Sequence, residues 1–137
     1  MNRTALEHII RAAGDLLQEH TVVIVGSQAI LASYPESRLP PDAIRSTEAD
    51  VLPLDDPDGH KADVIDGTLG ELSDFDELYG YHGDGVSLET SVLPDGWETR
   101  LIPYRNETTD GVTGLCLEKH DLCIASSLHS GKRTCNS

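Results

Sequence analysis

Two acidic residues, Glu48 and Asp50, stand two positions apart in a short apolar run and are the clearest candidates for chemistry in the sequence. Residues two apart on a β-strand point to the same face, so we expect both carboxylates at one edge of a sheet. Two converging carboxylates repel each other unless a cation lies between them. Mg²⁺, which binds carboxylates together with substrate phosphates and water, is the predicted cation. An acidic strand face that binds nothing is the alternative.

A second candidate element is the dipeptide Gly26-Ser27, which follows the β-branched run Thr21 to Val25 and precedes a short helical pattern. Glycine at a strand-to-helix turn lets backbone N–H groups approach an anion, and the helix dipole favours negative charge there. The hydroxyl of Ser27 adds a donor. Such junctions are common, but this one stands one predicted strand before the acidic pair, so together they indicate a phosphate site beside a metal site.

The elements that position these residues are predicted from hydrophobic spacing and turn signals. A helix over 3–18 begins with a capping box from Thr4 to Glu7, and Asp58 is expected to cap a later helix. The remaining expected elements are strands 21–25 and 48–54, a short helix 28–33, a loop 34–47 ending in one helical turn, and helices 60–69 and 71–78.

The last third of the sequence changes to a period of two. It predicts a β-hairpin made of residues 85–93, the turn Pro94-Asp95-Gly96 and residues 99–104, then a strand 111–117 and a helix from His120. The fold class is therefore expected to be α/β (α+β), a small mixed β-sheet flanked by helices. The length of 137 residues fits one domain spanning residues 1–137.

The charge distribution restricts the partners. The chain carries 24 acidic and 10 basic residues, and between Ser46 and Thr99 there are 15 carboxylates with Lys61 as the single base. A nucleic-acid binder normally shows the opposite sign, because phosphate neutralisation supplies most of its affinity. The acidic segment instead indicates a divalent metal, a cationic small molecule, or simply a solvated surface. A face that docks a basic protein partner is a further alternative.

The sequence gives no indication of membrane insertion or secretion. No apolar run approaches the ~20 residues that span a bilayer, and residues 1–20 are amphipathic rather than patterned as a signal peptide. We therefore expect a cytoplasmic protein with no membrane contact.

The pattern IVGSQAIL followed by STEADVLP resembles the nucleotidyltransferase superfamily typified by DNA polymerase β. The phrases GSQAIL, EADVLP, GVSLETSVLPDGWETRL and TGLCLEKHDL, spread over most of residues 20–125, are similar to a family of small bacterial nucleotidyltransferase-like proteins. That family is related to the nucleotidyltransferases of abortive-infection and toxin–antitoxin systems. The resemblance implies a nucleotidyltransferase fold.

The resemblance also implies a site and a reaction. Glu48 and Asp50 would hold one or two Mg²⁺ ions, and Gly26 and Ser27 would bind the phosphates of an NTP. An NMP would then pass to an unidentified acceptor, with a small cationic molecule or a protein hydroxyl favoured over nucleic acid. The superfamily expects a third catalytic carboxylate on a following strand. Asp84, Glu89 and Glu98 compete for this place, and Glu89 is chosen because it falls inside the expected strand 85–93.

Two departures from the family pattern leave alternatives open. The twenty residues 28–47 between Ser27 and Glu48 form a longer gap than usual and bring Arg38 and Arg45 as candidate triphosphate ligands or simply solvated arginines. The final SSLHSGKRTCNS lacks the family's lysine-containing helix, so we expect a chain truncated or altered after about residue 125. A catalytically inactive binding module, or a toxin–antitoxin component, is the alternative function.

Overall fold

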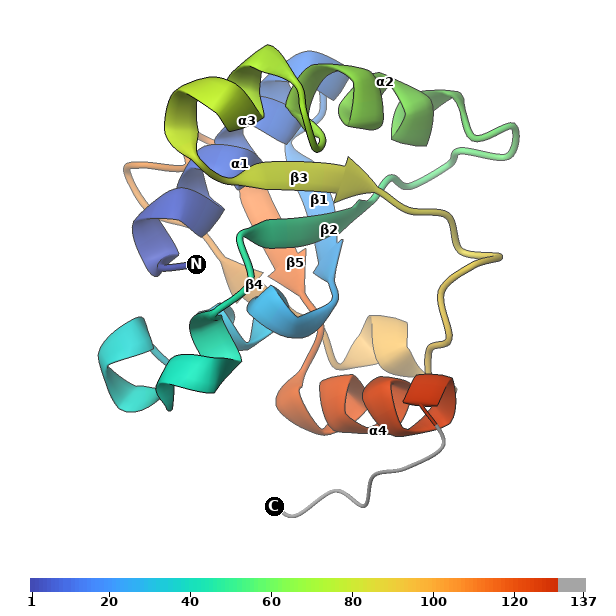
Figure 1. Ribbon diagram of the computed structural model, residues 1–137. Coiled ribbons are helices and arrows are strands. Elements are labelled where there is room, and N and C mark those ends of the chain that lie inside the picture. The colour runs from blue at the N-terminus through green and yellow to red at the C-terminus, as the bar shows by residue number, and fades with distance from the viewer. Residues whose placement is uncertain (131–137) are drawn as a thin grey trace.

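The computed structural model describes residues 1–130, with side chains described to residue 125, and centres on a five-stranded mixed β-sheet between helices (Figure 1). This confirms the expected α/β class. The strands are β1 (Thr21–Val25), β2 (Glu48–Leu52), β3 (His82–Gly85), β4 (Ile102–Tyr104) and β5 (Thr113–Cys116). The α-helices are α1 (Arg3–Leu17), α2 (His60–Leu69), α3 (Asp74–Tyr79) and α4 (Lys119–Ser130). Short 3₁₀ segments are η1 (Ser27–Ala32), η2 (Glu36–Arg38), η3 (Pro41–Ile44) and η4 (Trp97–Thr99).

The strands lie in the order β3-β2-β1-β5-β4. The first two strands in sequence, β1 and β2, pair antiparallel, whereas β1 with β5 and β2 with β3 pair parallel. The edge strand β4 is antiparallel to β5. Figure 1 shows α1, α2 and α3 grouped on the upper side of the sheet and α4 below it, beside η1.

Helix α1 covers one face of the sheet because its apolar residues recur at helical spacing, and Leu6, Ile9, Ile10 and Ala13 are fully buried. The helix begins as expected, but the cap is Asn2, whose side chain accepts a hydrogen bond from the N–H of Ala5. The predicted capping box is therefore wrong. Its acidic member, Glu7, turns into the protein instead and accepts a hydrogen bond from the hydroxyl of Tyr104.

Two strand glycines let α1 approach the sheet closely. A Cβ built on Gly114 would lie 2.5 Å from Cδ1 of Ile10, and one built on Gly83 would lie 3.1 Å from Cγ2 of Ile9. The same glycines identify which face α1 covers. Because side chains alternate along a strand and paired residues share a face, Glu48, Asp50, His82 and Asp84 project from the opposite face.

The expected hairpin of residues 85–93 with 99–104 is wrong. Strand β3 ends at Gly85, residues 88–90 form a turn, and β4 pairs with β5 instead. The hydroxyl of Ser91 donates to the carbonyl of Ser87 (2.8 Å), and the Oγ of Ser87 accepts from the N–H of Thr90 (3.3 Å). Hydroxyl side chains that bond the local backbone in this way compete with a strand ladder, which explains the difference.

Helix α2 has the predicted bounds, but its first turn is satisfied by a different residue. The carboxylate of Asp56 accepts from the N–H groups of Lys61 and Ala62, whereas Asp58 accepts only from the N–H of His60. The N-cap position itself is Gly59, which has a positive φ.

An ion pair connects Arg100, which follows η4, to Asp121 of α4. The Nε and Nη2 atoms of Arg100 donate to the carboxylate of Asp121 at 2.9 and 2.8 Å, and Asp121 is buried. Trp97, three residues before Arg100, is buried in the core.

No helix among residues 1–130 has the length and apolar character that crossing a bilayer requires. The expected alteration of the chain after about residue 125 falls mainly on residues outside the part whose side chains are described.

Because α1 packs closely against Gly114, we predict that Gly114→Ala destabilises the protein by about 2 kcal/mol, since the added methyl group overfills a packed core. Equilibrium urea unfolding of the variant measures this loss. The double variant Gly114→Ala with Ile10→Val removes the methyl group that is in the way and should recover part of the loss. If the changes in the free energy of unfolding of Gly114→Ala and Ile10→Val simply add in the double variant, the proposed contact between the two residues is wrong.

Candidate functional site

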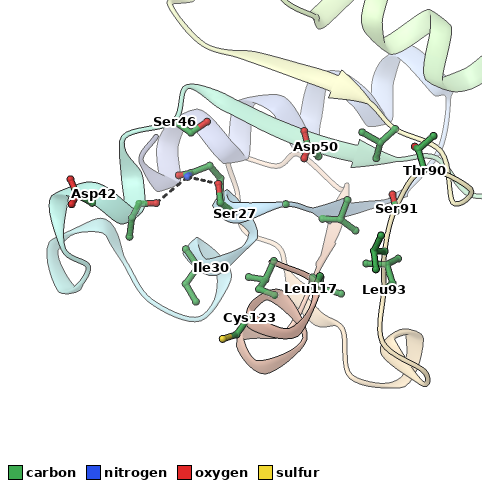
Figure 2. A pocket seen from close by; sticks show the side chains of 18 residues that line it. Ser27, Ile30, Asp42, Ser46, Asp50, Thr90, Ser91, Leu93, Leu117 and Cys123 are labelled. Atoms are coloured by element: carbon green, nitrogen blue, oxygen red, sulfur yellow. Dashed lines mark hydrogen bonds between the residues drawn. The ribbon is translucent and has the colours of Figure 1, made fainter. Parts of the chain in front are cut away.

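A cleft of about 920 Å³ opens at the end of β1 on the face of the sheet opposite α1. Figure 2 shows Ser27 and Asp50 on one side of it, Ser91 and Leu93 on another, and Cys123 of α4 below. The cleft therefore collects the Gly26-Ser27 turn, one residue of the acidic pair, the 86–93 segment and α4. Its other lining residues are mostly apolar, including Val25, Ile30, Val86, Val92, Leu117 and Leu122.

The turn at Gly26 is built around the side chain of Asp50. Gly26 has φ 79°, a conformation that favours glycine, and a Cβ built there would lie 2.4 Å from Oδ2 of Asp50. The register of β1 with β2 explains this approach, because Val25 pairs directly with Asp50. The predicted turn and the predicted acidic residue therefore lie in contact, as the sequence pattern requires.

The segment that follows the turn differs from the expectation. It is the six-residue 3₁₀ helix η1 rather than an α-helix, so it offers only a small dipole to an anion. Anion binding at this turn would therefore depend on individual donors, with the hydroxyl of Ser27 the first of them.

Gln28, which sequence reasoning did not single out, holds the hydroxyl of Ser27. Its side chain is 1% exposed, and its Nε2 donates to Oγ of Ser27 (3.0 Å) and to the carbonyl of Ala43 (3.0 Å). Because the oxygen of Ser27 accepts this bond, its own proton is left to donate toward the cleft. Oε1 of Gln28 is buried and has no hydrogen-bond partner in the described chain. The sequence feature that could have identified Gln28 is its place as a polar residue inside the apolar run VVIVGSQAIL.

Strand β3 brings a third carboxylate to the pair. Because β2 and β3 are parallel, Glu48 pairs with His82 and Asp50 pairs with Asp84. Ligand atoms of Glu48, His82 and Asp84 all lie within 4.8 Å of one another, close enough that the three could hold a metal ion. The acidic cluster is defined here as Glu48, Asp50 and Asp84.

Glu89, the expected third carboxylate, is not part of this cluster. It lies in an exposed turn rather than a strand and lines a separate cavity next to Trp97. Glu98, the other candidate, is exposed on η4. The preference for Glu89 depended on the expected strand 85–93, and the parallel pairing of β3 places Asp84 beside the pair instead.

The three carboxylates perturb one another. A hydrogen bond with Asp50, then burial and the charge of Asp50, raise the pKa of Glu48 to about 7, against smaller opposing effects of Asp84 and His82. Burial, followed by the charge of Glu48, raises the pKa of Asp84. One oxygen of Asp50 is buried and has no hydrogen bond among the described residues. A bound cation would relieve both the repulsion and the unsatisfied oxygen, so the donor set fits a divalent ion.

The loop arginines do not reach this site. Arg45 pairs with Asp42 at 2.5 Å, and both side chains are at least 80% exposed. Arg38 is also exposed, and neither arginine lines the cleft. The tyrosines Tyr79 and Tyr81 stack with each other near His8 and Phe75, away from the cleft lining.

The fold and site define an α/β protein with an acidic cluster at one edge of a mixed sheet, beside a glycine turn and a cleft. Comparisons of the chain with protein-family models, with curated proteins and with solved structures found no match.

The contact between Gly26 and Asp50 predicts that Gly26→Ala destabilises the protein by about 2 kcal/mol, since it combines a positive φ with a clash. Gly67→Ala is the matched control. Gly67 lies in α2, and a Cβ there meets nothing within 4 Å, so that variant should gain up to about 1 kcal/mol. Thermal and urea unfolding measure both. Equal effects of the two substitutions would contradict the role of the turn.

The repulsion in the acidic cluster predicts a pH-dependent stability. The folded state raises the pKa of Glu48 above that of the unfolded chain, so it holds this proton more tightly, and stability falls as Glu48 ionises up to about pH 7. The substitution Asp50→Asn removes both the carboxylate that shares a hydrogen bond with Glu48 and its negative charge. It should therefore lower the pKa of Glu48 and reduce the loss of folding stability between about pH 5 and about pH 7.

Carboxyl ¹³C NMR titration of Glu48 and unfolding at about pH 5 and about pH 8 test this expectation. Asp63→Asn, a change at an exposed position of α2, serves as the control. An unchanged titration of Glu48 in the Asp50→Asn protein would refute the coupling.

Proposed function

We propose that this protein is a Mg²⁺-dependent nucleotidyltransferase that moves an NMP from an NTP to an acceptor hydroxyl. The observation that carries the proposal is the contact of the Gly26-Ser27 turn with Asp50 at the cleft, with Glu48 and Asp84 beside Asp50 on the same face of the sheet. A volume of about 920 Å³ lies within the range of small-molecule and cofactor sites. The resemblance of IVGSQAIL and STEADVLP to the polymerase β-like superfamily points to the same chemistry.

In the proposed site, different residues would bind the ion, the phosphates and the rest of the nucleotide. The carboxylates of Glu48 and Asp50 bind the ion, and the hydroxyl of Ser27, oriented by Gln28, donates to the phosphates of the NTP. When bound, Mg²⁺ neutralises charge on the phosphates that react and leave. The apolar wall of the cleft, formed in part by Leu117 and Leu122, faces the remainder of the nucleotide.

Asp84 takes the place that the sequence assigned to Glu89. In the proposed reaction the acceptor oxygen forms a bond to the α-phosphorus, and the bond from that phosphorus to pyrophosphate breaks. The proton of the acceptor hydroxyl passes to a carboxylate, for which Asp84 is the candidate because burial and Glu48 make it more basic than an ordinary aspartate. Asp84 is about one-quarter exposed, so an acceptor can reach it.

The charge of the chain bears on the acceptor. The acidic segment from Ser46 to Thr99 surrounds the cluster in sequence and would repel a polyanion. A small cationic molecule or a protein hydroxyl is therefore the favoured acceptor class, ahead of nucleic acid. The supply of NTPs and Mg²⁺ places the reaction in the cytoplasm.

Thermal shift with ATP, GTP, CTP and UTP, each with and without Mg²⁺, tests nucleotide binding at this site. A nucleotide at about 100 times its Kd should raise the free energy of unfolding by about 2.7 kcal/mol. Asp50→Asn should lose the Mg²⁺-dependent shift, whereas Asp63→Asn should keep it. No shift with any NTP would contradict the proposal.

Turnover is measured separately, as transfer of label from α-³²P NTPs to cationic small molecules and to protein substrates. The proposal predicts transfer that Asp50→Asn and Asp84→Asn reduce by at least about a hundredfold. Nucleotide binding without transfer would instead support the inactive binding module.

A further inference from the structure

His82 is a buried histidine at the edge of the acidic cluster, and the function proposed above does not use it. It lies on β3 beside Glu48, its side chain is 9% exposed, and neither ring nitrogen has a hydrogen bond in the described part of the protein. Its Nε2 lies 3.8 Å from Oε2 of Glu48 and 3.9 Å from Oδ1 of Asp84. Its Nδ1 faces Oδ1 of Asp76 at 3.4 Å.

A buried imidazole in this state is unusual. Most buried polar side chains find a hydrogen-bond partner, and an unsatisfied buried group carries a desolvation cost. The oxygens of Glu48 and Asp84 lie beyond hydrogen-bond distance of Nε2, and Asp76, although 3.4 Å from Nδ1, makes no hydrogen bond with it. An ion placed between Nε2 and the carboxylates of Glu48 and Asp84 would satisfy the ring nitrogen and separate the two negative charges.

Asp76 is held in a position that orients the ring. Its Oδ2 accepts a hydrogen bond from the N–H of Leu72 (3.0 Å), and this leaves Oδ1 directed at His82. A histidine that binds a metal usually donates its other N–H to a carboxylate, which sets the tautomer and directs the free nitrogen at the ion. Asp76 stands on the Nδ1 side of His82 and Glu48 and Asp84 stand on the Nε2 side, so a small movement of the ring would complete that arrangement.

We propose that Glu48, His82 and Asp84 bind a first-row transition-metal ion of the Mn²⁺ to Zn²⁺ series, with Asp76 as the positioning residue. Imidazole nitrogen suits these ions, whereas Mg²⁺ prefers oxygen ligands alone. The two ends of the acidic cluster therefore differ. Asp50 faces the cleft and the Gly26 turn, and His82 supplies nitrogen at the other end, with Glu48 between them.

The distances are compatible with this ion. Ligand atoms about 2.1 Å from a metal lie about 3 to 4 Å from one another, depending on the geometry. The three candidate ligand atoms all lie within 4.8 Å of one another, so side-chain movements of less than about 1 Å would close the site.

The inference deepens the proposed function, but the ion site itself needs no nucleotide. Asp84 would bind the ion through Oδ1, the oxygen nearest His82, and its other oxygen would remain the candidate acceptor of the proton. The competing account is an imidazolium ion that pairs with the surrounding carboxylates and binds no metal.

The test is isothermal titration of the full chain, stripped with a chelator, with Zn²⁺, Mn²⁺ and Mg²⁺ alone. We expect Zn²⁺ and Mn²⁺ to bind, and His82→Ala to weaken both by about tenfold or more while changing Mg²⁺ affinity by less than about twofold. Asp76→Asn should weaken Zn²⁺ binding by about tenfold. His60→Ala, which changes an exposed histidine of α2, should leave all three affinities unchanged.

A measurement on the unsubstituted protein keeps the test decisive even where His82→Ala fails to fold. Electron spin echo spectroscopy of the Mn²⁺-loaded protein should show coupling to one imidazole nitrogen. Absence of that coupling, or equal loss of Mg²⁺ and Zn²⁺ binding in His82→Ala, overturns the proposal. Failure of nucleotide transfer with metal binding intact would contradict the proposed function alone.

Discussion

The antiparallel register of β1 and β2 places Asp50 against Gly26, and the arrangement of the site depends on this contact. A side chain larger than hydrogen at position 26 would meet the Asp50 carboxylate, and that carboxylate has one oxygen with no protein partner among the described residues. The turn and the acidic residue therefore form one unit. The burial of Gln28 and its bond to Ser27 extend that unit into the wall of the cleft.

The parallel pairing of β2 with β3 adds the second constraint, because it brings Asp84 and His82 to the same edge. The hydrogen bond with Asp50 and burial raise the pKa of Glu48, and burial followed by the charge of Glu48 raises the pKa of Asp84, so ionising these groups is expected to cost folding stability. In such a site the repulsion destabilises the folded protein when no ligand is bound. A ligand that relieves the repulsion then binds more tightly, because binding removes that unfavourable energy.

The local parts of this structure were predictable from sequence, and the non-local parts were not. Apolar spacing identifies α1, β1 and β2, and with them Gly26, Ser27, Glu48 and Asp50. The third carboxylate was assigned to Glu89 because alternation continued past Gly85, whereas Ser87 and Thr90 close a turn there. The partner strand of β2 depends on packing between segments about thirty residues apart, which no local pattern encodes. His82 and Gln28 were missed because what distinguishes them is that they are buried polar side chains, and burial is visible only in the folded structure.

The most direct test of the account is a crystal structure of the protein grown with Mn²⁺ and a non-hydrolysable NTP analogue, with anomalous diffraction measured at the manganese edge. The account predicts anomalous density at the carboxylates of Glu48 and Asp50 and at the neighbouring group of Glu48, His82 and Asp84, with the triphosphate against Gly26 and Ser27. Triphosphate bound elsewhere, or an acidic cluster that holds no manganese under these conditions, would contradict it.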